Sequence, residues 1–566
     1  MLRELFCLSI VSAAGCFSLP GEPVVASGSG STGAAGTGET GAATTAPSAA
    51  SESSATSSAA DDAADVTDDR GTQDDSESGD VPAVCGDGRV EGSEACDDAN
   101  DIPADGCELD CSATAILDIG VGDDFSCVVT TMGHVRCWGE DDAGVLGKGT
   151  DGQHVGDDAS PCTAPVLSFG PDKEVVQLAT GHASKHACVR FADGTARCWG
   201  ANAYGQLGAA SVTDNFGDSI GEQLSEFPDL PFENVAAVEV GGFATCALIE
   251  DTPGEHDVYC WGRNEHGELG AGFTVAELPQ ALPGGPVDLG GAKVRQLSMG
   301  YNHSCVLLTD GNVRCWGYNG QGALGLGTVD DWDLTASVGD GVGNGLGQGL
   351  VPNSPALNVP LDDFEVTKIE VGTGASCALG DTAVRCWGGN NEGGLGYRFD
   401  QVSWDPEATC VFDDGGAGCV LTTPTTAVAL GDLHGAQLLE IELGRRGACA
   451  LDSAGIVRCW GRSHNGRHGY AIVDNVGHEV TPAQVYDALR SPGVDVGGTA
   501  TRLAVGYDHS CVEIDDGTVR CWGDGQWGQL GYRDDENVGD NETPAQYYAI
   551  HRGGAVGVFE AEDCGR

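Results

Sequence analysis

The sequence predicts an all-β protein made of repeated small sheets, and three observations predict it. A skeleton of G-x4-C, a short apolar run, a Gly-bearing turn and then C-W-G-x4-G-x-L-G recurs through residues 113–566, as in Gly300–Gly325. The apolar runs are rich in β-branched and aliphatic residues, which favour strands. Successive C-W-G motifs are 55 to 73 residues apart, a period that suits one small sheet with variable loops.

The N-terminus indicates export. Residues 1–16 carry Arg3, an apolar run and the small residues Ala14 and Gly15 directly before Cys16. This segment resembles a short bacterial lipoprotein signal, which predicts lipidation of Cys16 and a position on the outer membrane or cell surface. Glu4 and Ala13 depart from that pattern, so an ordinary cleaved signal peptide and a secreted protein are the alternative.

Two further segments precede the repeats. Residues 17–82 are dominated by Ser, Gly, Thr, Ala and, later, Asp, which predicts a disordered tether because there is almost nothing to bury. Residues 83–112 form a cysteine-rich mini-domain that resembles a short repeat of exported myxobacterial proteins. Its four cysteines allow three disulfide connectivities, and the sequence does not choose among them: Cys85, Cys96, Cys107 and Cys111.

The same mini-domain holds an acidic set with the oxygen ligands that calcium prefers. The alternative is a solvated acidic loop, since the spacing is not that of an EF-hand. The candidate ligands are Asp97, Asp98, Asn100, Asp101 and Asp105. We expect no other cofactor.

Each repeat contains a predicted hairpin that places its two cysteines opposite each other. In CVLLTDGNVRC the turn Thr309–Gly311 folds about Asp310, so Cys305 faces Cys315, and opposed residues of an antiparallel pair can form a disulfide. The fifth copy is shorter and turns at Asp381 and Thr382. The predicted pairs are Cys127–Cys137, Cys188–Cys198, Cys246–Cys260, Cys305–Cys315, Cys377–Cys386, Cys449–Cys459 and Cys511–Cys521.

Downstream of each C-W-G, a Leu-Gly turn and an extended piece with an early proline complete the copy. The proline suits the first residue of an edge strand. Such pieces begin near Pro165, Pro482 and Pro544. Copy six has Arg467 and His468 where the turn expects leucine, so its turn should pack less well.

The motifs V-x-x-G, C-A-L, D-G-x-V-x-C-W-G-x-N-x-x-G-x-L-G and T-P-x-x-V together resemble the regulator of chromosome condensation repeat, in a cysteine-paired bacterial form. The resemblance covers residues 114 to 566 and implies a seven-bladed β-propeller. In such folds the first and last segments share a blade, and the candidates here are 116–121 and 555–560. The cysteines left over suggest two more bridges, Cys410–Cys419 across a short loop and Cys162–Cys564 where the ends of the ring meet.

Composition and motifs exclude several functions. With 86 acidic and 27 basic residues, the formal net charge is −59, which repels phosphate backbones, and nucleic acid is not an expected partner. The 24 cysteines favour disulfides in an exported protein over metal sites. No phosphate-binding loop and no H-E-x-x-H motif occurs, and no catalytic residue is predicted. His303 and His509 precede repeat cysteines, and packing explains them better than metal.

We therefore expect a non-catalytic, monomeric propeller that binds a protein or glycan at the cell surface and meets the membrane only through its anchor. The resembling family includes secreted bacterial propellers that act as binders. Trp332 and Trp404, in insertions at the rim, are the candidate contacts, although each could equally pack its own loop. The alternatives are guanine-nucleotide exchange, the role of the family's namesake, and an enzyme that uses the propeller channel.

Overall fold

The structure is a computed structural model of the 566-residue chain. It describes residues 115–552, apart from 209–213, 273–274, 279–284, 328–336, 339–351, 398–407, 414–415, 473–492 and single or paired positions within 150–163, 354–362 and 425–432. The chain divides into two compact units, Met1–Glu77 and Ser78–Arg566, and all described residues belong to the second.

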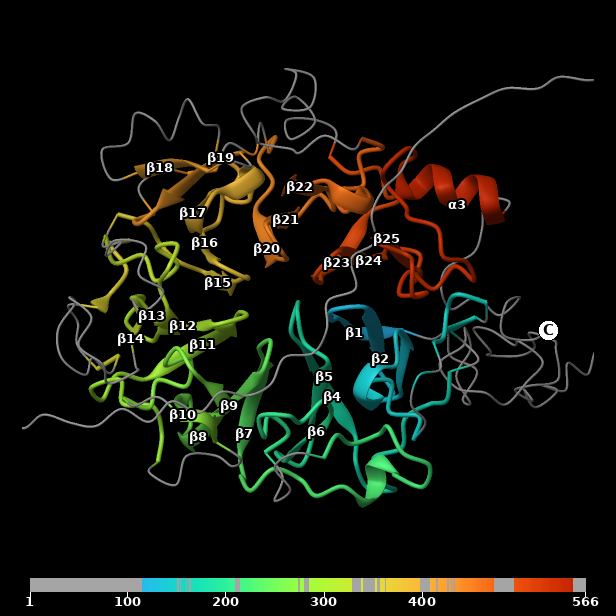
Figure 1. Ribbon diagram of the computed structural model, residues 1–566, viewed down its shortest axis with the longest axis horizontal. Coiled ribbons are helices and arrows are strands. Elements are labelled where there is room, and N and C mark those ends of the chain that lie inside the picture. Colours follow the sequence, from blue (N-terminus) through green and yellow to red (C-terminus); the bar gives the residue numbers. More distant parts are fainter. Residues whose placement is uncertain are drawn as a thin grey trace, which may run out of the picture. The chain divides into compact units, whose positions relative to one another are not determined.

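Seven units of three antiparallel strands follow one another around a common axis, with the first strand of each unit innermost (Figure 1). We call these units blades one to seven. Their strands are β1 (Ile116–Val121), β2 (Phe125–Thr130) and β3 (Val135–Gly139); β4 (Val175–Thr180), β5 (His186–Phe191) and β6 (Ala196–Gly200); β7 (Val235–Val240), β8 (Ala244–Thr252) and β9 (Glu255–Asn264); β11 (Val294–Met299), β12 (His303–Leu308) and β13 (Val313–Tyr318); β15 (Lys368–Val371), β16 (Ala375–Leu379) and β17 (Val384–Gly389); β20 (Leu438–Leu443), β21 (Gly447–Asp452) and β22 (Val457–Gly461); and β23 (Ala500–Val505), β24 (His509–Ile514) and β25 (Val519–Gly523).

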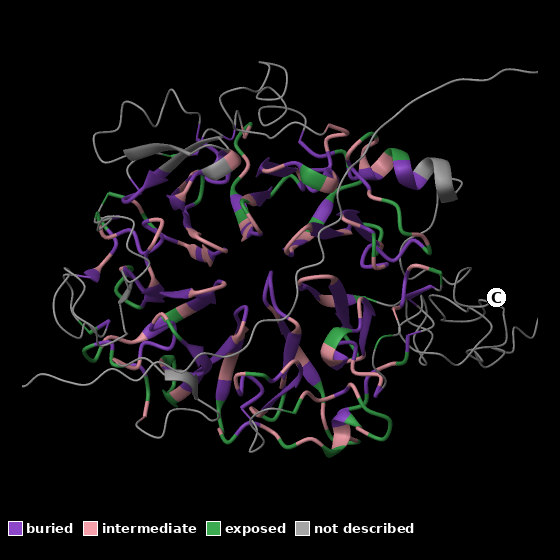
Figure 2. Cartoon of the chain, in the orientation of Figure 1, coloured by how far each residue is buried: buried purple, intermediate pink, exposed green. Residues whose placement is uncertain are grey.

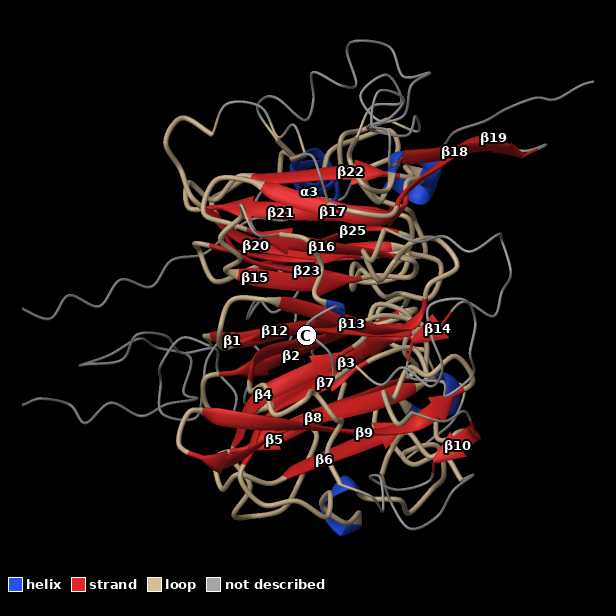
Figure 3. Ribbon diagram, turned by 90° about the vertical axis from the view of Figure 1, so that its left-hand side faces the viewer, coloured by secondary structure: helices blue, strands red, loops and turns tan. Residues whose placement is uncertain are grey.

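Other elements extend individual blades. Strand β10 (Val275–Leu278) pairs with β9, β14 (Ser337–Val338) pairs with β13, and the hairpin of β18 (Ala408–Asp413) and β19 (Gly416–Leu421) pairs with β17. Strands dominate the fold, and its helices are short (Figure 3). The helical elements in the described residues are η1 (Asp142–Gly144), η3 (Leu224–Glu226), η5 (Asn391–Gly393), η6 (His464–Gly466) and α3 (Pro544–Arg552). The described part of the chain contains no helix with the length and apolarity that a membrane span requires.

The hairpin register confirms the predicted disulfides. Cys305 is the direct partner of Cys315 in the β12–β13 pair, and the fifth copy pairs Cys377 with Cys386 about a two-residue turn. Gly311 has φ = +87°, as the predicted turn requires. All seven expected pairs are bonded: Cys127–Cys137, Cys188–Cys198, Cys246–Cys260, Cys305–Cys315, Cys377–Cys386, Cys449–Cys459 and Cys511–Cys521.

The opening glycine of each G-x4-C motif lets neighbouring blades approach. A Cβ atom added to Gly241 would lie 2.7 Å from the carbonyl oxygen of Gly300, and one added to Gly300 would lie 2.2 Å from that of Gly372. The series continues through Gly444 and Gly506. A Cβ atom added to Gly506 would lie 2.5 Å from the carbonyl oxygen of Gly122 in blade one. Any side chain at these positions would therefore push blades apart.

The C-W-G tryptophans fill the space between blades, and they also hydrogen-bond across it. Trp387 Nε1 donates to the carbonyl of Ala323, 2.8 Å away, which directly precedes the leucine of the Leu-Gly turn in blade four. All seven indoles are fully buried. The same bond to the preceding blade is made by Trp138, Trp199, Trp261, Trp316 and Trp522. Of these seven indole nitrogens, all in described residues, only that of Trp460 lacks a hydrogen-bond partner.

Buried histidines reinforce three junctions, through His186, which contacts the Thr245 hydroxyl at 2.9 Å, His303 and His509. His303 Nε2 lies 2.8 Å from the Ser376 hydroxyl of the next blade, and that hydroxyl donates its proton to the Ala323 carbonyl. The imidazole is therefore the donor to the hydroxyl, and its Nδ1 is left unprotonated. Burial lowers the pKa of His303 to about 3. His509 makes the same contact with Ser126, 2.9 Å away, which joins blade seven to blade one. The packing role predicted for both histidines is confirmed.

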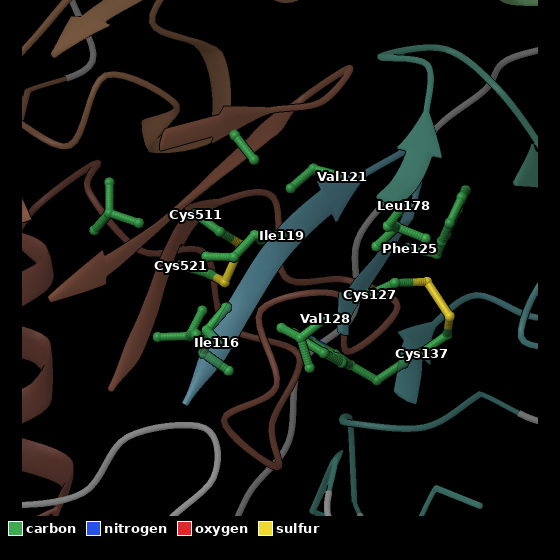
Figure 4. Packing of buried hydrophobic residues seen from close by; sticks show 14 of the residues in the cluster. Ile116, Ile119, Val121, Phe125, Cys127, Val128, Cys137, Leu178, Cys511 and Cys521 are labelled. Atoms are coloured by element: carbon green, nitrogen blue, oxygen red, sulfur yellow. A yellow bond between two sulfur atoms is a disulfide. The ribbon is translucent and has the colours of Figure 1, made fainter. Parts of the chain in front are cut away.

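The apolar core runs through the blades, so most strand residues are buried (Figure 2). Where the last blade meets the first, Ile119 lies beside the Cys511–Cys521 disulfide, and both belong to one buried cluster (Figure 4). Arginines that precede the second cysteine tie the outer chain to its blade in several copies; Arg197, for example, donates to Asp229 and to the Phe169 carbonyl.

One predicted strand is wrong. Thr543–Gln546 was expected to be extended, but Pro544 begins helix α3. The Gln546 N–H donates to the Thr543 hydroxyl at 3.2 Å, and the Thr543 N–H donates to the Gln546 side chain at 3.1 Å. This is a capping box with proline at the first helical position, so local capping prevails over the expected edge strand.

The blade expected to be shared by the chain ends is tested only in part. Residues 116–121 form β1, the innermost strand of blade one, and 555–560 lie outside the described residues. Blades one and seven each take their three strands from contiguous sequence.

Candidate functional site

The axis of the blades contains a polar cavity of about 270 Å³, formed by the innermost strands. We call it the central cavity. Side chains of these strands alternate between the core and the axis, so the polar residues between the buried ones face inward. The titratable residues that line it are Asp118, Glu239, Lys368, Glu370, Glu440 and Glu442.

The central cavity is electrostatically crowded. Burial raises the pKa of Glu239 to about 8, and burial raises those of Asp118 and Glu440 to about 6. Burial and the neighbouring Glu442 also raise the pKa of Glu370. Among the described residues that line the cavity, Lys368 is the one cation, and its ammonium lies 2.8 Å from Glu442. Burial would lower the pKa of Lys368, but Glu442, Glu370 and Glu440 raise it overall.

The raised pKa values mean that carboxyl groups of the cavity, such as that of Glu239, keep their protons at neutral pH. The described side chains of the cavity form neither an activated nucleophile nor a set of metal ligands. No group of three or more His, Cys, Asp or Glu in the described residues could hold a metal ion. The carboxylates are instead separated around the axis and held by backbone amides, as Glu440 is by the Leu503 N–H at 2.9 Å.

Seven short loops, each joining the first and second strands of a blade, form one face that we call the loop face. They are residues 122–124, 181–185, 241–243, 300–302, 372–374, 444–446 and 506–508. His182 and Thr373, from blades two and five, hydrogen-bond at 3.1 Å across the centre of this face. Burial lowers the pKa of His182 to about 4, so the imidazole is neutral at neutral pH.

Charge on the loop face is unevenly distributed. The side of blade one is acidic, with Asp123, Glu140 and Asp524 near Asp124. Burial and these neighbours raise the pKa of Asp124 to about 7. Blade six carries the opposite charge, with Arg445, Arg446, Arg462 and Arg467 on or beside its loop. Burial, with Arg462 and Arg445 nearby, lowers the pKa of Arg467 to about 9.

Aromatic rings cover the loops of blades three and four. The Arg263 guanidinium lies 4.3 Å from the ring centre of Phe243 and 5.3 Å from that of Tyr301, and these two rings lie 5.3 Å apart. Arg263 is buried and paired with Glu268, so the half-buried rings of Phe243 and Tyr301 form the accessible part of this surface, and aromatic residues are enriched at interaction sites on proteins.

The predicted site residues mostly lie outside the described residues. This holds for Cys16, Trp332 and Trp404, for the cysteines and acidic set of 83–112, and for Cys162 and Cys564. The strand register places Cys410 opposite Cys419, but their side chains are not among the described residues, so that bridge stays a prediction. The inward residues of the innermost strands were not among the predicted site residues. The alternation of apolar and polar residues before each G-x4-C motif indicates them.

Comparison with known proteins agrees with this geometry. Models of the regulator of chromosome condensation (RCC1) repeat match residues 116–145, 175–206, 255–307 and 294–323. The ultraviolet-B receptor UVR8 of Arabidopsis thaliana is 26% identical over 397 residues, which are 69% of this chain and 75% of the receptor. The human E3 ubiquitin-protein ligase HERC2 is 27% identical over 413 residues, 72% of this chain, and the match spans only 7% of the ligase.

Solved structures show the same fold. A crystal structure of Kap60 bound to yeast RCC1 (Prp20) matches with a TM-score of 0.52 and 20% identity, over 76% of this chain and 84% of that one. Human WBSCR16 matches with a TM-score of 0.51 and 19% identity, over 72% and 87% of the two chains. The chain therefore contains RCC1 repeats at the matched segments, and its fold is that of a β-propeller similar to those of the RCC1 proteins.

Proposed function

We propose that the protein is an exported, lipid-anchored propeller that binds a protein or glycan at the cell surface and performs no catalysis. The observation that carries this proposal is the set of seven buried hairpin disulfides. Disulfides of this number persist in oxidising compartments and are rare in the cytosol. The lipoprotein-like segment that ends at Cys16 supports the anchor, and 17–82 would hold the propeller away from it.

A binding role is supported by the loop face, where aromatic rings and arginines gather on a scaffold fixed by disulfides and inter-blade hydrogen bonds. Binding sites commonly lie on loops positioned by a rigid scaffold. Similarity to the yeast protein at 20% identity supports the fold, and it does not extend exchange activity or a Kap60-like partner to this chain.

Cell fractionation with thiol alkylation tests export. We expect the protein in the membrane fraction, with the fourteen hairpin thiols blocked until a reductant is added. Cys16→Ser should release the protein from that fraction without exposing those thiols. Protein found in the cytoplasm with alkylatable hairpin cysteines would overturn the proposal.

Capture of cell-surface material tests binding. We expect the full chain to retain a surface protein or glycan, and Trp332→Ala and Trp404→Ala to weaken retention if the rim insertions contribute. Retention lost on substitution of Phe243 and Tyr301 instead would assign binding to the loop face. Material retained equally by a denatured control would contradict a specific binding role.

A further inference from the structure

A small pocket opens on the loop face where blades four, five and six meet. Its volume is about 140 Å³, enough for one ring-sized group. Four polar side chains line it, namely Tyr318, Gln321, Thr373 and Arg446, and glycine backbone supplies most of the rest. The pocket therefore offers two hydroxyls, one amide and one guanidinium within a single enclosure.

Arg446 is held in the pocket by an unusual backbone. It has φ = +60°, a conformation that favours glycine, whereas the residues at the same loop position of the other blades have no positive φ. Blade five has glycine, Gly374, at this position. A non-glycine residue in this region is strained, and such strain tends to persist at functional sites.

The charge of Arg446 is only partly balanced. Its guanidinium lies 3.4 Å from a Glu392 oxygen, and Arg462 lies 3.3 Å from the other oxygen of the same carboxylate. Two arginines thus share one acid. Arg446 is also 45% exposed, so it can turn donors towards a ligand in the pocket.

Glycines make the room for the polar side chains. An added Cβ at Gly389 would lie 2.3 Å from the Gln321 amide oxygen, and one at Gly374 would lie 2.6 Å from it. Gln321 of blade four therefore reaches across blade five because both positions lack a side chain. Thr373 is fixed from the opposite side by its hydrogen bond to His182.

We propose that this pocket binds the carboxylate-bearing ring of an acidic sugar, with Arg446 receiving the carboxylate and Gln321, Thr373 and Tyr318 meeting the ring hydroxyls. The inference rests on the proposed function and names a ligand class for it. Arginine pairs with carboxylates in a fork of two hydrogen bonds. Hydroxyls and an amide both donate and accept, as a polyol requires.

The net charge of the protein further restricts the class of ligand that the pocket can bind. A net charge of −59 repels polyanions such as nucleic acids, since their approach is governed by the long-range field. A single carboxylate on an otherwise neutral sugar meets much less repulsion. The small volume also favours one ring over an extended peptide, which would need a groove.

Titration of the full chain with matched probes tests the proposal. The probes are methyl β-D-glucuronide, methyl β-D-glucoside, which lacks only the carboxylate, and N-acetyl-diglycine, which has a carboxylate and no ring. Saturation-transfer NMR and calorimetry give the affinities. We expect the glucuronide to bind at least tenfold more tightly than either of the other two probes.

Two variants locate the binding. Arg446→Gly should fold well, because glycine favours the backbone conformation at this position, and should abolish the preference for the glucuronide. Gly389→Ala should displace Gln321 and weaken both sugars. Arg295→Gln removes an equally single charge from an exposed site on β11 and should leave every affinity unchanged.

Three outcomes would overturn the proposal: equal binding of the two sugars, a preference that survives Arg446→Gly, or N-acetyl-diglycine binding as tightly as the glucuronide. The last would assign the pocket to peptide carboxylates. If the sugars fail but cell-surface capture persists in Arg446→Gly, the pocket assignment fails while the proposed binding function stands.

Discussion

A buried histidine at position 468 occupies the place where the other six blades have leucine, as Leu324 and Leu530 do. His468 is 2% exposed, and neither ring nitrogen makes a well-aligned hydrogen bond, although a weak backbone hydrogen bond with Trp460 acts to raise the pKa of the ring. Burial and the adjacent Arg467 lower its pKa to about 3. A poorly satisfied polar ring gives a physical reason to expect a weaker turn in copy six, which stays a prediction.

We predict that His468→Leu stabilises the protein by roughly 1–2 kcal/mol at pH 7, since burying an unpaired polar group is costly. The gain should grow as the pH falls from about 6.5 towards 3, because in that range the unfolded histidine binds a proton that the folded one refuses. Calorimetric melting at pH 7 and pH 5 measures both effects. A variant that melts at or below the wild-type temperature at both pH values would contradict this account.

For Glu239 in the central cavity, we predict that its effect on folding stability has the opposite pH dependence. The folded protein keeps its proton up to about pH 8, whereas the unfolded chain releases it near pH 4.5, so ionisation opposes folding as the pH rises between these values. We predict that Glu239→Gln raises stability by roughly 1–3 kcal/mol at pH 8.5 and little at pH 5.

Chemical denaturation at the two pH values checks the Glu239 prediction. Glu233→Gln is the matched control, since Glu233 is an exposed glutamate ahead of β7 with the same change of charge. An equal gain in both variants would point to a general charge effect and not to burial in the cavity.

At the scale of the element, the hairpins followed from sequence because their determinants are local. Turn glycine, β-branched neighbours and cysteine spacing together fix the register of Cys305 against Cys315. Helix α3 was also encoded locally, in Thr543-Pro544-Ala545-Gln546, but the comparison with other proline-initiated pieces favoured a strand. These four residues have the sequence of a capping box with proline at the first helical position, which favours a helix.

Removing this cap should loosen α3. Thr543→Ala loses the hydroxyl that accepts the Gln546 N–H, and we predict a local cost of about 1 kcal/mol. Hydrogen exchange of the α3 amides measures it, with amides of β24 as the internal reference. Because Tyr547 and Tyr548 are buried, the helix should remain docked. Unchanged exchange in α3 would show that the cap contributes nothing.

At the scale of the whole molecule, the sequence predicted the number of blades but not what faces the axis or joins the blades. The pairing of Trp387 with the Ala323 carbonyl, or of His303 with Ser376, links residues more than sixty positions apart. Such contacts depend on the geometry of the assembled ring. For the same reason the pocket around Arg446 could not be seen in sequence, since three blades contribute to it.

The junction between the last and first blades has the same contacts as the junction between blades four and five. Ser126 bonds to His509 and to the Gln529 carbonyl, at 2.9 and 3.0 Å, just as Ser376 bonds to His303 and to the Ala323 carbonyl, at 2.8 and 2.9 Å. Among the described residues, no disulfide links one blade to another. In the described part of the ring, the junction of blades seven and one is therefore a non-covalent junction equivalent to that of blades four and five.

This equivalence predicts that Ser126→Ala and Ser376→Ala destabilise the protein equally, each by about 1–3 kcal/mol, because each leaves a buried imidazole N–H and a carbonyl without their shared hydroxyl. Parallel denaturation of the two variants, with Ser219→Ala as an exposed control, measures the difference. A bridge between Cys162 and Cys564 would hold the ends of the ring together even when their junction is weakened. A distinctly smaller cost for Ser126→Ala, restored to that of Ser376→Ala by Cys564→Ser, would therefore indicate that such a bridge closes the ring.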